Sequence, residues 1–153
     1  MPDSYARRGE EVEQTIVVGV DGSEGGAKAL EFAAEEAALR QARLRIVSAW
    51  EIPVAAYSAG AAPPLDPATL DAFRLRAEQI ADDAVAAVNK LQPSLEVEAL
   101  TATGQPADAL LAQSDADVIV VGRRGLGGFK SLLLGSVSQQ VVHHATCPVV
   151  VVQ

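Results

Sequence analysis

Glycines are concentrated in one stretch of the chain, residues 118–146, in a pattern that suits the binding of a phosphate. A short apolar run is followed by a group of four glycines, Gly122, Gly125, Gly127 and Gly128. Glycine allows positive φ angles and has no Cβ, so successive backbone N–H groups can turn toward one anion. Further along, Gly135 precedes Ser136, which is predicted to be the N-cap of a helix. The free N–H groups and the positive dipole end of such a helix favour a phosphate.

Cationic side chains lie between these two glycine-containing turns. They are Arg123, Arg124 and Lys130. Their positive charges would balance the negative oxygens of a polyphosphate wrapped by the loop. A plainer reading is also open, because glycines after a strand can be simple turn formers and charged loop residues can be solvated.

The common phosphate-binding motifs are absent from the sequence. A P-loop requires Gly-Lys followed by Ser or Thr, but here Lys130 and Ser131 follow Phe129. The dinucleotide pattern G-x-G-x-x-G can start at Gly125 and Gly127, but its third glycine would fall on Lys130. The spacing in this chain is instead G-x2-G-x9-G-S.

The composition indicates one compact domain and argues against several kinds of partner. The 153 residues are 49% hydrophobic but only 4% aromatic, so the core must consist of Val, Leu, Ile and Ala. A net charge of -8 argues against binding to nucleic acid or to an anionic membrane surface. No apolar run has the length of a membrane helix, and the N-terminus lacks the pattern of a signal peptide. The single cysteine, Cys147, excludes an internal disulfide and a cysteine-built zinc site, which favours the cytoplasm.

Alternating strand and helix patterns predict an α/β fold. The expected strands are residues 15–20, 44–50, 95–102, 118–122 and 149–152. The expected helices are residues 24–40, 67–92, 107–113 and 136–144, the first two with Ser23 and Asp66 as N-caps. This order requires parallel strands, right-handed crossovers and helices on both faces of the sheet. Ligands of such sheets lie beyond the carboxyl ends of the strands, so Asp21 and Gly122 should face one crevice.

The sequence also allows predictions for the two ends of the chain and for one long loop. Residues 1–13 are polar and are expected to be a flexible leader to a single domain of residues 14–153. Residues 54–67 are rich in Ala, Gly and Pro and are expected to form a mobile lid or an insertion. The last strand, Val149 to Val152, would leave four valines on a sheet edge, so we expect a homodimer in which two such strands pair.

The glycine spacing is accompanied by other segments that together resemble a known family. They are VVGVDGS at residues 17–23, VSAW at 47–50, GQPADALL at 104–111 and CPVVVV at 147–152. With Gly122, Gly125, Gly135 and Ser136 they resemble the universal stress protein family, in its single-domain, ATP-binding form. The resemblance covers nearly the whole chain from about Gln14. It implies a Rossmann-like fold similar to that of the adenine nucleotide alpha hydrolases, with five parallel strands in the order 3-2-1-4-5.

By position, the resemblance implies contacts with the base and the ribose of ATP. Gly19, Val20 and Asp21 would lie along the ribose and the phosphates, with Asp21 on the ribose or on a phosphate-bound Mg²⁺. The backbone of Ala49 would hydrogen-bond to adenine, and Val121 would pack on the base.

The resemblance also implies a set of contacts with the ribose and phosphates, made by the glycine-rich segment and the following helix. These residues are Gly122, Arg123, Gly125, Gly127, Gly128, Gly135, Ser136 and Val137. The second arginine, Arg124, and the long loop at residues 54–67 are unusual, so the contacts of the triphosphate end stay open.

Together these observations predict a nucleotide-binding regulatory protein of the stress response, with little or no ATP hydrolysis. Hydrolysis needs a group that orients water, but Asp21 is better placed for ribose or metal, and His143 and His144 lie at the far end of their helix. The expected ligand is ATP, or else AMP or cAMP, with Mg²⁺ on the phosphates. The alternatives are a slow ATPase or self-phosphorylating enzyme, a binder that prefers cAMP, and a chaperone-like dimer that binds no nucleotide.

Overall fold

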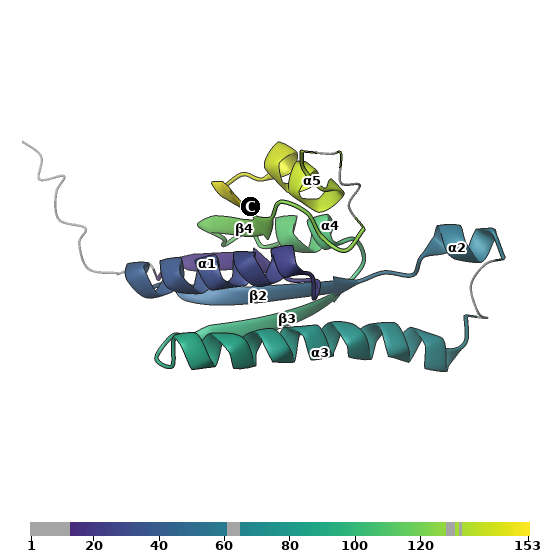
Figure 1. Ribbon diagram of the computed structural model, residues 1–153, viewed down its shortest axis with the longest axis horizontal. Helices are drawn as coiled ribbons and strands as arrows, with labels where there is room; N and C mark the ends of the chain where they lie inside the picture. The colour runs from purple at the N-terminus through teal and green to yellow at the C-terminus, as the bar shows by residue number, and fades with distance from the viewer. Residues whose placement is uncertain (1–12, 61–64, 128–130, 132) are drawn as a thin grey trace, which may run out of the picture.

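The computed structural model of the chain describes residues 13–60, 65–127, 131 and 133–153. Within these residues the strands are β1 (Thr15–Gly19), β2 (Arg43–Trp50), β3 (Val97–Thr103), β4 (Val118–Gly122) and β5 (Val149–Val152). The helices are α1 (Glu24–Arg40), α2 (Val54–Ser58), α3 (Pro67–Leu91), α4 (Pro106–Leu111) and α5 (Ser136–His144) (Figure 1).

The strands form one parallel sheet in the order β3-β2-β1-β4-β5, which confirms the predicted fold and strand order. Strand β1 lies between β2 and β4, with Val18 opposite Ile46 on one side and Val120 on the other. The chain winds from β1 toward β3 and then crosses to β4, so the winding direction reverses between β1 and β4. In open α/β sheets this point leaves a crevice at the carboxyl ends of the strands.

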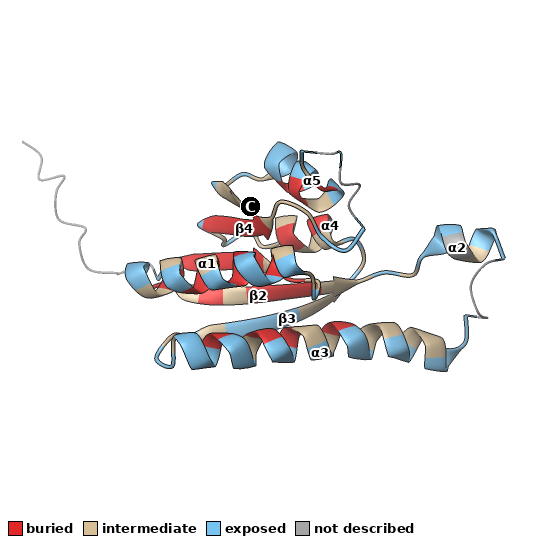
Figure 2. Cartoon of the chain, viewed as in Figure 1, coloured by how far each residue is buried: buried red, intermediate tan, exposed pale blue. Residues whose placement is uncertain are grey.

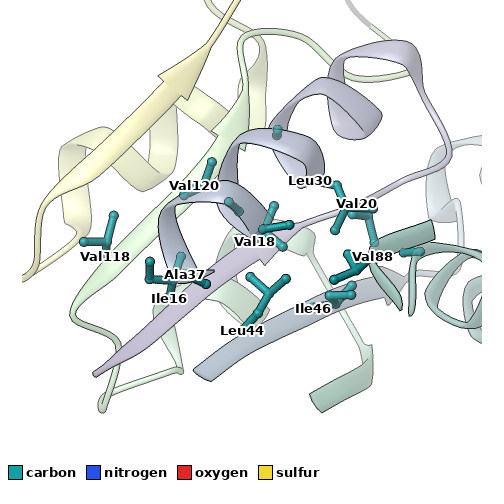
Figure 3. Packing of buried hydrophobic residues seen from close by; sticks show 14 of the residues in the cluster. Ile16, Val18, Val20, Leu30, Ala37, Leu44, Ile46, Val88, Val118 and Val120 are labelled. Atoms are coloured by element: carbon teal, nitrogen blue, oxygen red, sulfur yellow. The ribbon is translucent and has the colours of Figure 1, made fainter. Parts of the chain in front are cut away.

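Helices cover both faces of the sheet, and the alternation of strand side chains builds a core under each layer (Figure 2). Ile16, Val18 and Leu44 point toward α1 and α3 and form the larger cluster, drawn in Figure 3. Val17 and Val121 point to the other face, where they pack with residues of α4 and α5. The predicted aliphatic core is therefore divided into two layers by the sheet.

Helix α1 begins where the sequence predicted. The side chain of Ser23 accepts a hydrogen bond from the backbone N–H of Gly26 at 3.0 Å, as an N-cap does. The face of α1 toward the sheet includes Ala29, Ala33 and Ala37, which are completely buried. Their small side chains let the helix axis approach the sheet closely, so the beginning of α1 is fixed relative to the end of β1.

The boundaries of other elements differ from the predictions in part. Asp66 caps α3 through Thr69 N at 2.8 Å, with Pro67 as the first helical residue, as predicted. Residues 54–67 were expected to be a loop throughout, but a short helix, α2, occupies Val54–Ser58. Strand β3 begins two residues later than predicted, and α4 starts one residue earlier and ends earlier. The predicted leader, apart from Glu13, lies outside the described residues, as do residues 61–64.

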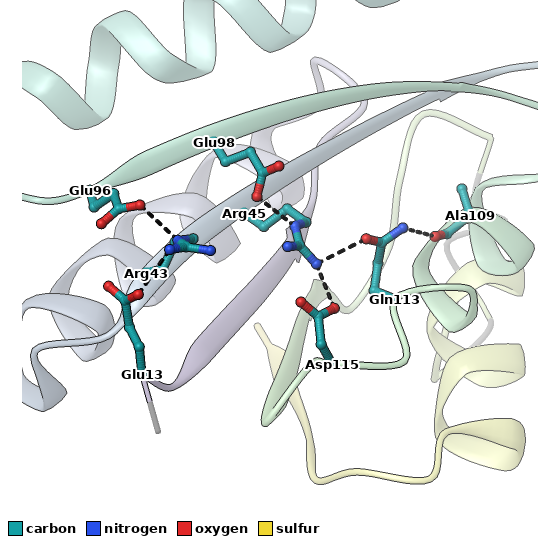
Figure 4. Close-up of polar contacts among 8 residues, drawn as sticks. All are labelled: Glu13, Arg43, Arg45, Glu96, Glu98, Ala109, Gln113 and Asp115. Carbon is teal, nitrogen blue, oxygen red and sulfur yellow. Dashed lines mark hydrogen bonds and ion pairs between the residues drawn. The ribbon is translucent and has the colours of Figure 1, made fainter. Parts of the chain in front are cut away.

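A partly buried arginine connects β2 to the sheet edge at the end of the strands opposite the crevice (Figure 4). The side chain of Arg45 is 12% exposed and donates to Glu98 at 2.9 Å and to Asp115 at 2.6 Å. The hydrogen bond to Asp115 raises the pKa of the guanidinium, and the same bond holds the pKa of Asp115 below its ordinary value. Neighbouring Arg43 pairs with Glu96 and with Glu13. These ion pairs connect β2 with β3 and with the segments before β1 and β4, and their residues do not line the crevice.

Candidate functional site

A cavity of about 780 Å³ lies at the carboxyl ends of the strands, within the range typical of small-molecule sites. Its walls come from the β1–α1 turn, the end of β2, the start of α4, the segment after β4 and the start of α5. The lining residues are Gly19, Val20, Asp21, Gly26, Val47, Ala49, Glu51, Gln105, Pro106, Ala107, Gly122, Arg124, Gly125, Leu126, Gly127, Gly135, Ser136, Val137, Ser138 and Gln140. Segments that are about a hundred residues apart in the sequence therefore meet in one hollow, as the predicted topology requires.

Most of the residues predicted for the site lie in this wall. Those that do are Gly19, Val20, Asp21, Ala49, Gly122, Gly125, Gly127, Gly135, Ser136 and Val137. Two others, Val121 and Arg123, do not line the cavity. Gly128 and Lys130 lie outside the described residues.

The two predicted residues outside the wall have identifiable places in the fold. Val121 is 3% exposed and packs into the core beneath α4 and α5. The backbone of Arg123 donates to Val152 at 2.7 Å, and its carbonyl oxygen accepts from Gly135 N at 2.8 Å. Arg123 thus connects the end of β4 to the last strand and to the start of α5.

We call residues 122–127 the glycine loop, and close contact rather than φ explains two of its glycines, Gly122 and Gly125. Both a positive φ and the lack of a Cβ were predicted to be their use; none of Gly122, Gly125 and Gly127 has a positive φ, but the lack of a Cβ matters at Gly122 and Gly125. A Cβ on Gly122 would lie 2.6 Å from the carbonyl oxygen of Gly25 in α1, and a Cβ on Gly125 would lie 2.5 Å from a carboxylate oxygen of Asp21. The loop therefore lies directly against the beginning of α1.

The carboxylate of Asp21 lies at the centre of this contact. Its Oδ1 accepts from the backbone N–H of Ser23 at 2.9 Å and from the Ser23 hydroxyl. Its Oδ2 accepts from the backbone N–H of Leu126 at 3.2 Å. An ionised carboxylate has about four lone-pair sites, so Asp21 keeps capacity for a further donor or for a cation.

The start of α5 differs from the prediction in one respect. Ser136 was predicted to be the N-cap, but the N-cap is Gly135, and Ser136 is the first helical residue. Among the described residues no side chain caps this end, so the first N–H groups of α5 have no side-chain acceptor there. The hydroxyl of Ser138 lies 2.9 Å from the carbonyl oxygen of Arg123 and donates within the turn. The uncapped amides and the helix dipole make this end of the cavity suited to an anion.

Apolar side chains predominate in one part of the wall, beside Glu51 and Gln105, and the glycine loop and α5 form another part, which also includes Leu126 and Val137. Val47, Ala49 and Ala107 supply apolar surface next to β2 and α4. The glycine loop, with Arg124, and the start of α5 supply amides and a positive charge on the β4 side. The cavity can therefore hold a molecule with an apolar part at one end and an anionic part at the other.

Several lining residues were not predicted, and only some left a signal in the sequence. Gly26 stands in the first turn of a helix, where glycine is unfavourable, and that cost was a usable signal. Glu51 follows a predicted strand directly, at the end where ligands bind. Gln105, Leu126 and Gln140 line the cavity only because distant elements meet there.

Metal and thiol chemistry have little support among the described residues. No group of three or more His, Cys, Asp or Glu side chains among them could hold a metal ion. His143 contacts the carbonyl oxygen of Gln139 through Nδ1, at 2.9 Å. Burial raises the pKa of the Cys147 thiol, which packs against the core as a small apolar group. No helix in the described part of the chain is long and apolar enough to cross a membrane.

Comparisons with known proteins agree with this fold. A protein from Thermus aquaticus, the "universal stress protein in QAH/OAS sulfhydrylase 3'region", is 39% identical over 143 residues, which cover 92% of this chain and 98% of that one. The chain also matches Rv2623 of Mycobacterium tuberculosis, a universal stress protein, but spans only 44% of its length.

Two solved structures resemble the chain over nearly all of both partners. One is a universal stress protein in complex with cAMP, with a TM-score of 0.69 and 28% identity, covering 92% of this chain and 97% of that one. The other is the universal stress protein of Archaeoglobus fulgidus in complex with dAMP, with a TM-score of 0.67 and 26% identity, covering 93% and 99%. The sequence model of the universal stress protein family matches residues 13–153, and the chain belongs to this family.

Proposed function

We propose that this protein binds an adenine nucleotide, with ATP as the first candidate, and acts as a nucleotide-dependent regulatory protein of the stress response. The observation that carries the proposal is the division of the cavity into an apolar end and an end lined by backbone amides. A nucleotide has the matching division between its base and its phosphates. The cavity volume of about 780 Å³ leaves room for such a ligand.

The charges of the wall support one orientation of the nucleotide. Phosphates would lie against the glycine loop and the start of α5, where Arg124 and the helix dipole favour negative charge. The base would lie on Val47 and Ala49, with backbone groups of Ala49 in reach of its edge. Glu51 follows β2, across β1 from the glycine loop, and its negative charge disfavours phosphates at that end.

The relatives support an adenine base more directly than they support the triphosphate. One was solved with cAMP and the other with dAMP, and each carries a single phosphate. A nucleotide with one phosphate, cAMP or AMP, is therefore the second candidate ligand. Competition between ATP and cAMP for the purified protein decides between them.

A Mg²⁺ ion fits this proposal as a companion of the phosphates. Mg²⁺ commonly keeps several waters and binds to one or two carboxylates plus substrate phosphates, so it needs no larger protein ligand set. Asp21 lines the cavity and supplies one carboxylate. The ion would neutralise phosphate charge, while the amides of the glycine loop and α5 would position the phosphates.

We propose binding with little or no turnover. Phosphoryl transfer to water needs a residue that orients the attacking water. Among the described lining residues, the carboxylates are Asp21, already engaged by Ser23 and Leu126, and Glu51, on the β2 side. Release of phosphate from ATP at a rate above that of a Gly122→Glu variant would instead support a slow ATPase or self-phosphorylating enzyme.

We propose that the protein acts in the cytoplasm as a homodimer and that the two copies pair through β5. Strand β5 is at the edge of the sheet, and its four valines are all partly exposed. An edge strand of this composition is a template for pairing with a second copy. A strictly monomeric mass in sedimentation at micromolar concentration would contradict the dimer.

The nucleotide proposal is tested by what copurifies with the protein and by titration. Mass spectrometry of the extracted ligand is expected to find an adenine nucleotide, and calorimetry is expected to show binding of ATP with Mg²⁺. In the Ser136→Glu variant, the new carboxylate at the start of α5 should repel phosphates while favouring the helix itself. Leu39→Glu is the matched control, because it adds the same charge at an 80% exposed position near the C-terminal end of α1.

Comparing the two variants distinguishes an effect of charge at the site from a general effect of the added charge. The proposal expects Ser136→Glu to lose most of the affinity for ATP and Leu39→Glu to keep it. Equal affinity in both variants, or no adenine nucleotide bound by the unmodified protein, would overturn the proposed function.

A further inference from the structure

The carboxylate of Asp21 is enclosed by backbone from two distant parts of the chain. Its Oδ1 accepts a hydrogen bond from Ser23 N, in the turn that leads into α1. Its Oδ2 accepts a hydrogen bond from the N–H of Leu126, which is 105 residues after Asp21 in the sequence. A simple turn cap needs only the first of these bonds. The second connects the end of β1 to the glycine loop.

Two glycines leave the space that this carboxylate occupies. A Cβ on Gly26 would lie 2.9 Å from Asp21 Oδ1, and a Cβ on Gly125 would lie 2.5 Å from Asp21 Oδ2. Any other residue at either position would push the carboxylate away from its donors or move the backbone. The glycine on each side of the carboxylate is thus part of the same contact.

The glycine loop has a second attachment, near the start of α5. The carbonyl oxygen of Arg123 accepts from Gly135 N at 2.8 Å and lies within reach of the Ser138 hydroxyl. Beyond Arg124 the described loop residues are exposed, with Leu126 66% exposed at the cavity rim. Among the described residues, the hydrogen bond from Leu126 N to Asp21 is therefore a contact that holds the exposed part of the loop.

We infer that Asp21 is a positioning residue that anchors the glycine loop to the first turn of α1, before any ligand binds. In this position the loop presents its amides to the cavity, so the anchor also sets the affinity for phosphate groups. The second statement rests on the proposed function, whereas the first does not. This role is distinct from a contact of Asp21 with ribose or Mg²⁺, because it needs neither.

Amide hydrogen exchange measured by NMR in the nucleotide-free protein tests the anchor itself. Asp21→Asn keeps one acceptor oxygen but replaces the other with an amide that cannot accept a hydrogen bond. Loss of a hydrogen bond to a charged group should speed exchange at Leu126 N roughly tenfold or more. The matched control is Asp66→Asn, which removes the same charge at the cap of α3, where Asn caps as well as Asp.

Affinities measured in EDTA test the second statement. The Asp21→Asn variant should bind AMP and ATP about tenfold more weakly than the Asp66→Asn variant. Adenosine has no phosphate for the loop amides to bind, so its affinity should not change. A general loss of structure would weaken all three ligands alike.

Three results decide the inference. Unchanged exchange at Leu126 in Asp21→Asn, relative to the control, would overturn the anchor. A loss of affinity seen only with Mg²⁺ present would identify Asp21 as a metal ligand and overturn its positioning role in affinity. If the unmodified protein binds no adenine nucleotide, the proposed function fails, and the exchange at Leu126 alone decides the anchor.

Discussion

The contact between the glycine loop and α1 predicts different outcomes for substitutions at two glycines that are five residues apart, Gly122 and Gly127. A Cβ on Gly122 would lie 2.6 Å from the carbonyl oxygen of Gly25 and 2.7 Å from its carbonyl carbon. A Cβ on Gly127 would have no described atom within 4 Å. Neither glycine has a positive φ, so alanine is compatible with the backbone at both positions. The variants Gly122→Ala and Gly127→Ala therefore differ chiefly in whether the new methyl group meets another segment.

The size of the effect follows from these distances. Carbon atoms in contact are normally about 3.5–4.0 Å apart, so the Gly122 methyl group requires the two backbones to separate by about 1 Å. Overpacking of this kind costs about 1–3 kcal/mol. Both variants share a gain of about 0.4–1 kcal/mol because alanine lowers the entropy of the unfolded chain. The difference between the two variants removes that shared term and isolates the contact, at about 1–3 kcal/mol.

Urea unfolding followed by circular dichroism measures this difference. Gly122→Ala should unfold at a lower urea concentration than Gly127→Ala with an unchanged m-value, and its Tm should be lower by roughly 2–12 °C for a domain of this size. The free energies of unfolding of the two variants would agree within about 0.5 kcal/mol if surface position alone decided the outcome. Such agreement would refute the close contact between β4 and α1.

Three further predictions concern single side chains. Ser23→Ala removes the cap on Gly26 N and should lower the free energy of unfolding by about 1 kcal/mol in urea. Ser48→Ala should be neutral or stabilising, because the buried Ser48 hydroxyl has no hydrogen-bond partner among the described residues; a loss above about 1 kcal/mol would contradict this. The hydrogen bond to Arg45 lowers the pKa of Asp115 in the folded protein below its unfolded value of 3.8. The ionised carboxylate therefore stabilises the fold at pH values above 3.8, and this stabilisation is lost as the pH falls through the folded pKa. Asp115→Asn should therefore be less stable than the unmodified protein at pH 7, by under about 1 kcal/mol because the carboxylate is half exposed, and the difference should shrink in acid denaturation below about pH 4.

The strands and their direction could be predicted from the sequence because both depend on local patterns. The apolar runs TIVVG and VIVVG end at Gly19 and Gly122, and the helical periodicity between strands leaves parallel crossovers as the usual solution. The order of the strands was implied by the family resemblance, not by periodicity. Helix α2 was missed because Val54–Ser58 lies in an Ala- and Pro-rich segment with little amphipathic pattern.

The prediction of the Ser136 cap was wrong for a local reason. Ser and Gly are both found at N-caps, and in the pair Gly135-Ser136 either residue could fill that place. The structure starts the helix at Ser136, which is exposed and lines the cavity. The pair still places the start of α5 where an anion could bind, but Gly135 rather than Ser136 is the N-cap.

The glycines of the site differ in whether the local sequence can explain them. Gly22 has a φ of 81°, a conformation that its own turn requires and that a sequence can signal. Gly122 and Gly125 have no such conformation, and their lack of a Cβ matters only because Gly25 and Asp21 lie against them. A sequence shows both kinds of glycine as the same letter, since the partner that makes a side chain intolerable is about a hundred residues away. The shape of the cavity is therefore a property of tertiary contacts, and substitutions at these glycines should act through the segment that lies against them.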